Sequence, residues 1–191
     1  MSKSRLEAFS DGVIAILITI LVLEFKVPRG ADIAALRPLL PTALAYVLSF
    51  VYVGIYWNNH HHMLHATDKV DGRILWANLH LLFWLSLVPF ATAWMGQNRF
   101  PPVPVALYGV IMFMAGVAYY LLQAAIIRRQ GPDSTLRRAL GDDRKGKLSN
   151  LLNGGAVPLA FVSPWASLSV YVVVAVIWFV PDRRIERRLS A

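Results

Sequence analysis

Residues 5–25 of the chain read RLEAFSDGVIAILITILVLEF, and this stretch decides which class of fold the sequence can adopt. The segment 6–25 is predominantly apolar, and a helix of about 20 such residues crosses the hydrocarbon core of a bilayer. Lys26 ends the run. Lys3 and Arg5 precede it as in a signal peptide, but no small-residue cleavage site follows. We therefore expect a first transmembrane helix that is retained as an uncleaved anchor.

Five further apolar segments lie downstream of this helix. They cover residues 39–59, 74–95, 103–127, 148–162 and 164–180. The segment 148–162 is the weakest, because about 15 residues give only about 22 Å of helix, and Pro158 lies inside it. A re-entrant or interfacial segment is the alternative there. Of the 191 residues 57% are hydrophobic and only 16% are charged, against about 25% charged in soluble domains. The sequence predicts an all-α membrane protein with six transmembrane helices in a single domain, residues 1–191.

Basic residues are distributed unevenly over the segments between these helices. Lys and Arg number two in the N-terminus, two in the second loop, seven in the fourth and four in the tail, 15 in all. The first loop has three, the third has one and the fifth has none. Because basic residues accumulate on the cytoplasmic side, both termini are predicted to be cytoplasmic in a multi-pass protein of the cell membrane. The basic loop 128–147 is also a candidate for binding anionic lipid head groups.

The net charge of +8 follows from this distribution and does not indicate nucleic acid. A nucleic-acid surface would combine a basic patch with stacking aromatic residues, and no such patch is present in the sequence. Motifs for enzymatic chemistry are missing as well: there is no cysteine, no GxSxG elbow, no phosphate-binding loop and no dinucleotide fingerprint. The protein is therefore predicted not to be an enzyme. A TVGYG-like filter of backbone carbonyls is also missing, so any ion pathway must use another design.

Helical spacing sorts the side chains of the first helix into faces. Ile16, Thr19 and Leu23 stand at positions i, i+3 and i+7 and share a stripe about 60° wide, with Gly12 near it. Asp11 points about 140° away from Ile16. A carboxylate at membrane depth needs compensating partners, so Asp11 is either a functional group or part of a structural polar contact between helices. From spacing alone, ordinary helix packing explains the stripe.

Polar side chains of the second and third helices offer partners at the depth of Asp11. The second helix ends in WNNHHHMLH, residues 57–65, and the third carries Asn78. Histidines at i, i+4 spacing, such as His61 and His65, permit a metal site, but no glutamate lies between them as the general base of a metalloprotease. Hydrogen bonding to Asp11 is the preferred interpretation, and we predict no metal and no cofactor.

Four short motifs resemble a known family. Residues 5–12 fit R-x-x-x-F-S-D-G, the signature of the first helix in the transmembrane protein 175 family of endosomal and lysosomal potassium channels and their bacterial relatives. Trp57 with His60-His61 resembles the W-x-x-H-H at the end of that family's second helix, and residues 71–79 and 87–92 resemble its third helix. The likeness covers roughly the first half of the chain, and the second half fits only in hydropathy.

The resemblance implies a bacterial-type channel, in which subunits with one copy of the repeat form a homotetramer around a central pore lined by the first helix. By position, Ile16 falls at the family's narrow apolar ring, Thr19 at the hydroxyl position that follows, and Leu23 at a second apolar ring, with Gly12 beside this stripe. The motif aspartate joins a polar network with His and Asn of neighbouring helices. Its candidates here are Arg5, Phe9, Ser10, Asp11, His60 and Asn78.

The predicted function is a potassium-permeable cation channel, modestly selective for potassium over sodium, in which four isoleucine side chains exclude water and gate the pore. Glu24 is a candidate for concentrating cations at the outer mouth, although a surface position at the membrane edge explains it more simply. Two alternatives stay open: a proton-coupled secondary transporter or proton leak using Asp11 and the membrane-edge histidines, and a membrane enzyme with a metal in the histidine cluster. The predicted partners are further copies of the chain, potassium and other monovalent cations, and membrane lipids.

Overall fold

The computed structural model describes residues 2–131, 134–140 and 143–179 of the chain. Over these residues every regular element is helical, as the sequence predicts. The elements are α1 (Lys3–Leu23), the 3-10 helix η1 (Ile33–Leu39), α2 (Leu40–His65), α3 (Gly72–Ser86), α4 (Val88–Gln97), α5 (Pro102–Gln130), α6 (Thr135–Leu140), α7 (Arg144–Val162) and α8 (Pro164–Phe179). Residues 180–191, which include the last position of the predicted helix 164–180 and the four arginines of the tail, lie outside the described residues.

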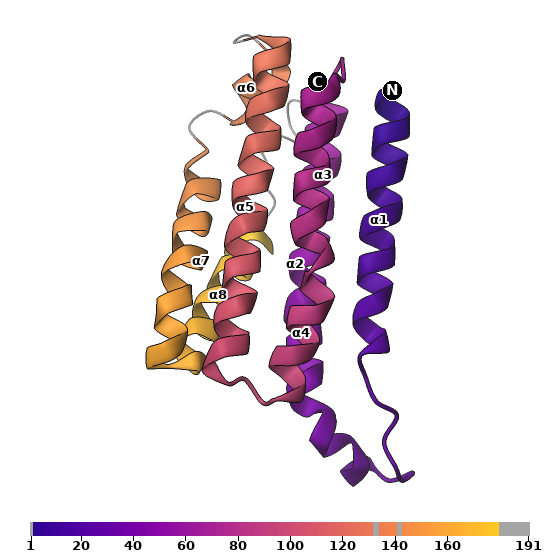
Figure 1. The fold of residues 1–191 in the computed structure, drawn as a ribbon, viewed down its shortest axis with the longest axis vertical. Helices are drawn as coiled ribbons and strands as arrows, with labels where there is room; N and C mark the ends of the chain where they lie inside the picture. The colour runs from indigo at the N-terminus through magenta and orange to yellow at the C-terminus, as the bar shows by residue number, and fades with distance from the viewer. Residues whose placement is uncertain (1, 132–133, 141–142, 180–191) are drawn as a thin grey trace.

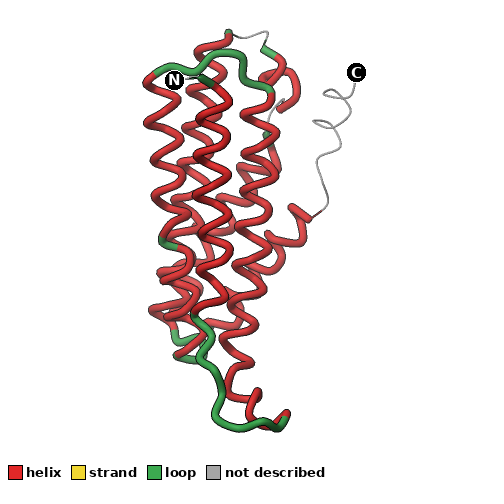
Figure 2. The backbone as a smooth tube through the Cα atoms, turned by 90° about the vertical axis from the view of Figure 1, so that its right-hand side faces the viewer, coloured by secondary structure: helices red, strands yellow, loops and turns green. Residues whose placement is uncertain are grey.

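The long helices form an up-and-down bundle with nearly parallel axes (Figures 1 and 2). Figure 1 shows α1 at one edge and α7 at the other. Accordingly, α1 packs on α2, α3 and α4, whereas α7 packs on α5 and α8. The N-terminus lies at the same end as α6 and the α2–α3 connection, and residues 24–39 project from the opposite end (Figure 2). The subunit therefore has two separate sides, an α1 side and an α7 side.

Four stretches of the described residues are long and apolar enough to cross a bilayer. They are Lys3–Leu23, Ile33–His65, Gly72–Gln97 and Pro102–Gln130, of 21, 33, 26 and 29 residues. The second joins η1 to α2, and the third joins α3 to α4. α8 is apolar but has only 16 residues, and α7 carries several polar residues. The six predicted segments lie, in order, at α1, α2, α3 with α4, α5, α7 and α8.

The segment predicted as one helix over 74–95 consists of two helices that meet at Leu87. Pro89 follows closely, and a proline has no amide hydrogen for the carbonyl of Leu85, which its ring also crowds. At the junction the Leu87 amide bonds to the carbonyl of Trp84, three residues back, at 3.3 Å, whereas in a regular α-helix it would bond to the carbonyl four residues back. Ala91 then bonds to the Leu87 carbonyl at 3.1 Å, and the new helix continues in nearly the same direction.

α7 begins at Arg144, before the predicted segment 148–162. Asp143 caps it by accepting a hydrogen bond from the Gly146 amide at 3.2 Å, which satisfies one of the free amides of the first turn. The end of the predicted basic loop 128–147 is therefore helical. α6 occupies the middle of that loop, and α5 continues into its beginning.

Gly109 allows α5 to approach α8 closely. A Cβ atom at this position would collide with the hydroxyl of Tyr171 and would lie 3.0 Å from its Cζ atom. Tyr171 is fully buried, and its hydroxyl donates to the Val105 carbonyl at 3.2 Å, so its ring is held in place. The contact between α5 and α8 therefore requires a residue without a side chain at position 109.

We expect Gly109→Ala to lower the free energy of unfolding by about 1–3 kcal/mol, the range for overpacking in a filled core. Gly155→Ala in α7 is the matched control, because a Cβ there has no atom within 4 Å. Alanine should leave that helix unchanged or stabilise it by up to about 1 kcal/mol. Thermal unfolding of both purified variants in detergent measures the difference. Equal melting temperatures would show that α8 moves aside freely.

Candidate functional site

α1 turns one face toward its own subunit. Its buried residues recur every three or four positions, the period of a helix face packed on a core. They are Leu6, Ser10, Ile14, Leu17 and Leu21. At 100° per residue the centre of this stripe lies about 150° from the centre of the stripe formed by Gly12, Ile16, Thr19 and Leu23. The subunit therefore fixes which face of α1 remains outward.

The outward stripe is apolar apart from one hydroxyl group. Ile16 is 58% exposed and Leu23 is 77% exposed, and Thr19 lies between them on the same face. The Thr19 hydroxyl donates to the Ile16 carbonyl at 2.8 Å, so its oxygen lone pairs stay available on the exposed side. Gly12 continues the stripe, and a Cβ there would have no atom within 4 Å. The chain thus brings all four predicted lining residues onto one uncovered face.

A buried chain of hydrogen bonds joins α1 to α3 and α2. The Ser10 hydroxyl donates to the Leu6 carbonyl at 2.9 Å. The Asn78 amide nitrogen donates to the Ser10 oxygen at 2.9 Å, and the Asn78 oxygen lies 2.7 Å from Nε2 of His60. Because the Asn78 oxygen can only accept, His60 must carry its proton on Nε2 in this arrangement. Every bond then has one direction, from His60 through Asn78 and Ser10 to the backbone of α1.

Asp11 lies beside this chain with a different partner. Its carboxylate accepts a hydrogen bond from the Trp57 indole nitrogen at 3.0 Å. The pair was not predicted, because its only sign in the sequence is the presence of Trp57 one turn before His60. Arg5 and Phe9 are both exposed on α1, Phe9 to 50%, so within the described subunit they do not enter the buried chain.

The remaining candidates lie at the two ends of the bundle. Glu24 is half-buried at the far end of α1, 3.5 Å from the Gln97 amide nitrogen. At the other end the rings of His61 and His65 stack with centroids 6.3 Å apart. Among the described residues no group of three His, Cys, Asp or Glu side chains is arranged to hold a metal ion.

A second buried polar cluster was not predicted. The Ser49 hydroxyl lies 2.7 Å from the Thr92 hydroxyl and 3.2 Å from that of Tyr108, and Thr92 donates to the Val88 carbonyl at 2.7 Å. These three side chains join α2, α4 and α5 inside the bundle. Serine and threonine are common in single membrane helices, so their sequence positions did not reveal that they would meet.

Comparison with known proteins places these features in a family. Residues 5–89 match the model of the family described as "Endosomal/lysosomal potassium channel TMEM175". A potassium channel of Chryseobacterium sp. (strain P1-3) is 52% identical over 190 residues, covering 100% of this chain and 99% of that protein. The bovine endosomal/lysosomal proton channel TMEM175 is 32% identical over 148 residues, which are 69% of this chain but 31% of that longer protein.

The fold is similar to that of a solved channel. The crystal structure of a lysosomal potassium-selective channel TMEM175 homolog from Chamaesiphon minutus aligns with a TM-score of 0.81 at 30% identity. The alignment covers 94% of this chain and 97% of the other. The likeness thus extends over α5, α7 and α8, for which the sequence provided hydropathy alone.

Asn78→Ala should lower the free energy of unfolding by about 2–4 kcal/mol. The substitution leaves the Nε2–H of His60 and the oxygen of Ser10 without their partner and opens a small cavity. Asn98→Ala is the control, because the Asn98 amide is exposed and bonds only to the Trp94 carbonyl one turn away. Its expected cost is below about 1 kcal/mol. Denaturant titration in mixed micelles measures both variants, and equal midpoints would contradict a structural role for the chain.

Proposed function

The chain belongs to the family of the endosomal/lysosomal potassium channel TMEM175, and on that premise we propose that four copies surround a central axis and form a potassium-permeable cation pore lined by α1. Its relatives are ion channels rather than enzymes, and the protein is a membrane channel of the same kind. The observation that carries the proposal is the uncovered face of α1, opposite the stripe that its own subunit buries.

Gly12 supports the close assembly of several α1 helices. A glycine inside a helix costs about 1 kcal/mol relative to alanine. Its own subunit gains nothing from the missing side chain, since a Cβ there meets no atom within 4 Å. Small residues let membrane helices approach one another closely. A neighbouring α1 at the axis is the partner that would use the space at Gly12.

The constriction in this proposal is a ring of four Ile16 side chains. Such a ring excludes water at its narrowest point, and a small widening rehydrates it, so the gate is hydrophobic. Thr19, whose oxygen is oriented outward by its bond to the Ile16 carbonyl, would contact an ion that keeps part of its hydration shell. Leu23 forms a second apolar ring. Potassium, which holds its water less tightly than sodium, is modestly favoured by such a pathway.

The buried hydrogen-bonded chain sets the rotation of α1 about its own axis. Turning α1 by one residue, about 100°, would break the Ser10–Asn78 bond and leave polar groups unpaired in hydrocarbon, where each costs several kcal/mol. Ile16 is thereby held toward the axis. Arg5 and Phe9, which the subunit leaves exposed, are available for contacts with a neighbouring copy at the cytoplasmic end.

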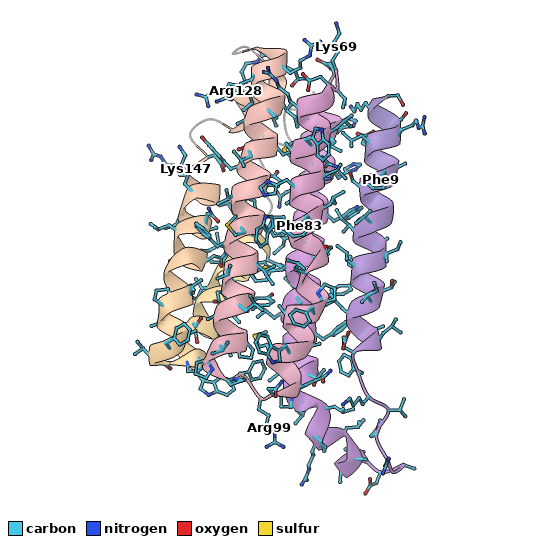
Figure 3. All side chains as sticks on the ribbon, in the orientation of Figure 1. Phe9, Lys69, Phe83, Arg99, Arg128 and Lys147 are labelled. Carbon is cyan, nitrogen blue, oxygen red and sulfur yellow. The ribbon has the colours of Figure 1, made fainter. Side chains whose placement is uncertain are left out.

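The proposed topology has six passes and cytoplasmic termini. The bundle end that holds the N-terminus also carries Lys69 and Arg128, whereas Arg99 lies at the opposite end (Figure 3). Basic residues mark the cytoplasmic side. α7 and α8 provide the fifth and sixth passes in a protein of the cell membrane. Glu24, beside Gln97 at the end opposite the N-terminus, stands near the outer mouth.

The proton pathway through Asp11 and His60 is less well supported. A relay needs a continuous series of hydrogen bonds between its titratable groups. Asp11 pairs with Trp57, and the bonds of His60 lead through Asn78 and Ser10 to a backbone carbonyl. The two groups therefore belong to separate contacts in the described subunit.

Ile16→Asn should raise the potassium flux into proteoliposomes several-fold, because a polar ring keeps the constriction hydrated. Val176→Asn in α8 is the matched control: it is 61% exposed, close to the value for Ile16, but it lies on a helix remote from α1. Its flux should equal that of the unmodified protein. A flux dye under a potassium gradient reads out both variants, and the same flux from both would refute the assigned pore.

Leu23→Cys should form disulfide-linked dimers on mild oxidation, because four copies of this exposed position converge at the axis. The sequence contains no cysteine, so a single introduced thiol reports on one position alone. Val176→Cys, on the far side of the subunit, should stay monomeric on a denaturing gel. Cross-linking at position 176 and not at position 23 would indicate that α1 faces the lipid, and it would remove the basis of the proposal.

A further inference from the structure

Arg5 lies on the same face of α1 as the proposed pore-lining residues. At 100° per residue it stands about 10° from the centre of the outward stripe that contains Gly12 and Ile16. It is exposed in the subunit, and Ile16 follows about 16 Å further along the helix axis. The outward stripe therefore begins with a positive charge, at the end of α1 that holds the N-terminus.

The carboxylates of α1 face away from Arg5 and have partners of their own. Glu7 and Asp11 stand about 150° and 110° from the centre of the stripe. Glu7 lies 3.9 Å from Nζ of Lys3, and Asp11 accepts the hydrogen bond of the Trp57 indole at 3.0 Å. Within the described part of the subunit Arg5 forms no ion pair and no hydrogen bond through its side chain. Its charge is therefore uncompensated by its own subunit.

Other basic side chains at this end of the bundle belong to other surfaces. Lys3 donates to the carbonyl of the last residue of α2 at 2.7 Å. Arg129 lies 3.7 Å from the carboxylate that caps α3. Lys147 lines a cavity of about 410 Å³ between α2, α5, α7 and α8, and the described lining of this cavity includes no residue of α1. Arg5 is thus the one charged residue on the outward stripe of α1, all of which is described.

We infer that four Arg5 side chains form a ring of positive charge at the inner mouth of the pore, and that this ring opposes the entry of potassium from the cytoplasm. The inference rests on the proposed function, which places α1 at the axis and the N-terminus in the cytoplasm. A guanidinium group stays protonated in proteins, so the ring keeps its charge at any physiological pH. A mouth lined by one sign of charge repels ions of the same sign and lowers their local concentration.

The two ends of α1 carry charges of opposite sign. Glu24 follows the last residue of α1, beside Gln97, at the end opposite Arg5. In the proposed tetramer the outer mouth therefore attracts cations and the inner mouth repels them. The positive end of the helix dipole of α1 adds to the charge of Arg5. At voltages of equal size, the pore should pass more inward than outward potassium current.

The distance between Arg5 and Ile16 limits the reach of the ring. The Debye length is about 8 Å at 0.15 M salt, roughly half of the separation of about 16 Å along α1. Arg5 therefore acts on the concentration of cations at the mouth and not on the hydration of the Ile16 constriction. At 0.01 M salt the Debye length is about 30 Å, and at 1 M it is about 3 Å. An effect of Arg5 on current must accordingly grow as salt is removed.

Arg5→Gln tests the ring in inside-out membrane patches, which fix the orientation of the full-length channel. In symmetrical 0.01 M potassium chloride the substitution should raise outward current about tenfold, the lower end of the range for electrostatic focusing. In 1 M salt the same substitution should change it less than about twofold. Arg5→Lys keeps the charge and should keep the unmodified ratio of inward to outward current. Lys69→Gln, which removes an exposed charge at the same end but outside α1, is the control and should also leave the ratio unchanged (Figure 3).

Arg5→Cys separates the charge of the side chain from its size. Because the sequence contains no cysteine, a thiol reagent applied from the cytoplasmic side modifies this position alone. A methanethiosulfonate that carries trimethylammonium should restore the low outward current, and one that carries sulfonate should raise outward current above the level of Arg5→Gln. The same response to both reagents would show that size and not charge acts at this position, and it would overturn the inference.

Ile16→Asn in the same patches separates this inference from the proposed function. If Ile16→Asn raises the current and Arg5→Gln leaves the current ratio unchanged at low salt, the pore stands and the charge ring is refuted. If neither substitution alters conduction, α1 does not line the pore and both proposals fail. Dissociation of the Arg5→Gln oligomer on size-exclusion chromatography would assign Arg5 to a contact between copies and would also refute the ring.

Discussion

The structure depends on one constraint, that a polar group in hydrocarbon must find its partner inside the protein. Ser10, Asn78 and Nε2 of His60 meet this demand with directed bonds that tie α1 to α3 and α2, whereas Nδ1 of His60 is buried without a partner. The apolar residues above and below Ser10 on α1 pack in the same direction. These hydrogen bonds therefore define the rotation of α1 about its own axis, which apolar contacts alone would define less strictly. As a consequence, the same residues of α1 always form its exposed face.

α2 connects the two sides of the subunit. Trp57 and His60 stand at i, i+3 and contact α1 and α3, whereas Tyr56 and Asn59, offset by one residue, line the cavity on the α7 side. Neighbouring residues on a helix are about 100° apart, so one helix serves both sides without conflict. The polar end of α2 is therefore divided between two environments, although in the sequence it reads as a single cluster.

The sequence predicted those features of the fold that depend only on residues close together in the chain. Apolar runs marked the helices, and the spacing of Ile16, Thr19 and Leu23 placed them on one face, which the subunit leaves exposed. Contacts between helices were harder to predict. The pairing of Asp11 with Trp57 depends on the relative rotation and height of two helices, which no periodicity specifies. Pro89 is present in the sequence, but membrane helices often tolerate a proline. Its presence alone therefore did not predict that the segment 74–95 consists of two helices.

The weak hydropathy of α7 has a physical reason in the packing. Its polar residues Ser149 and Asn153 are buried, and with Asn150 they face the cavity. The side away from the bundle carries Leu148, Leu151 and Val162, all well exposed. Mean hydropathy averages over both faces of α7 and so understates how apolar its exposed surface is. Polar residues are tolerated in a membrane helix where they face protein or a cavity, so the polar residues of α7 are compatible with the fifth pass that we propose for it. The polar residues that made the segment 148–162 the weakest of the six predicted helices are therefore the residues that line the cavity.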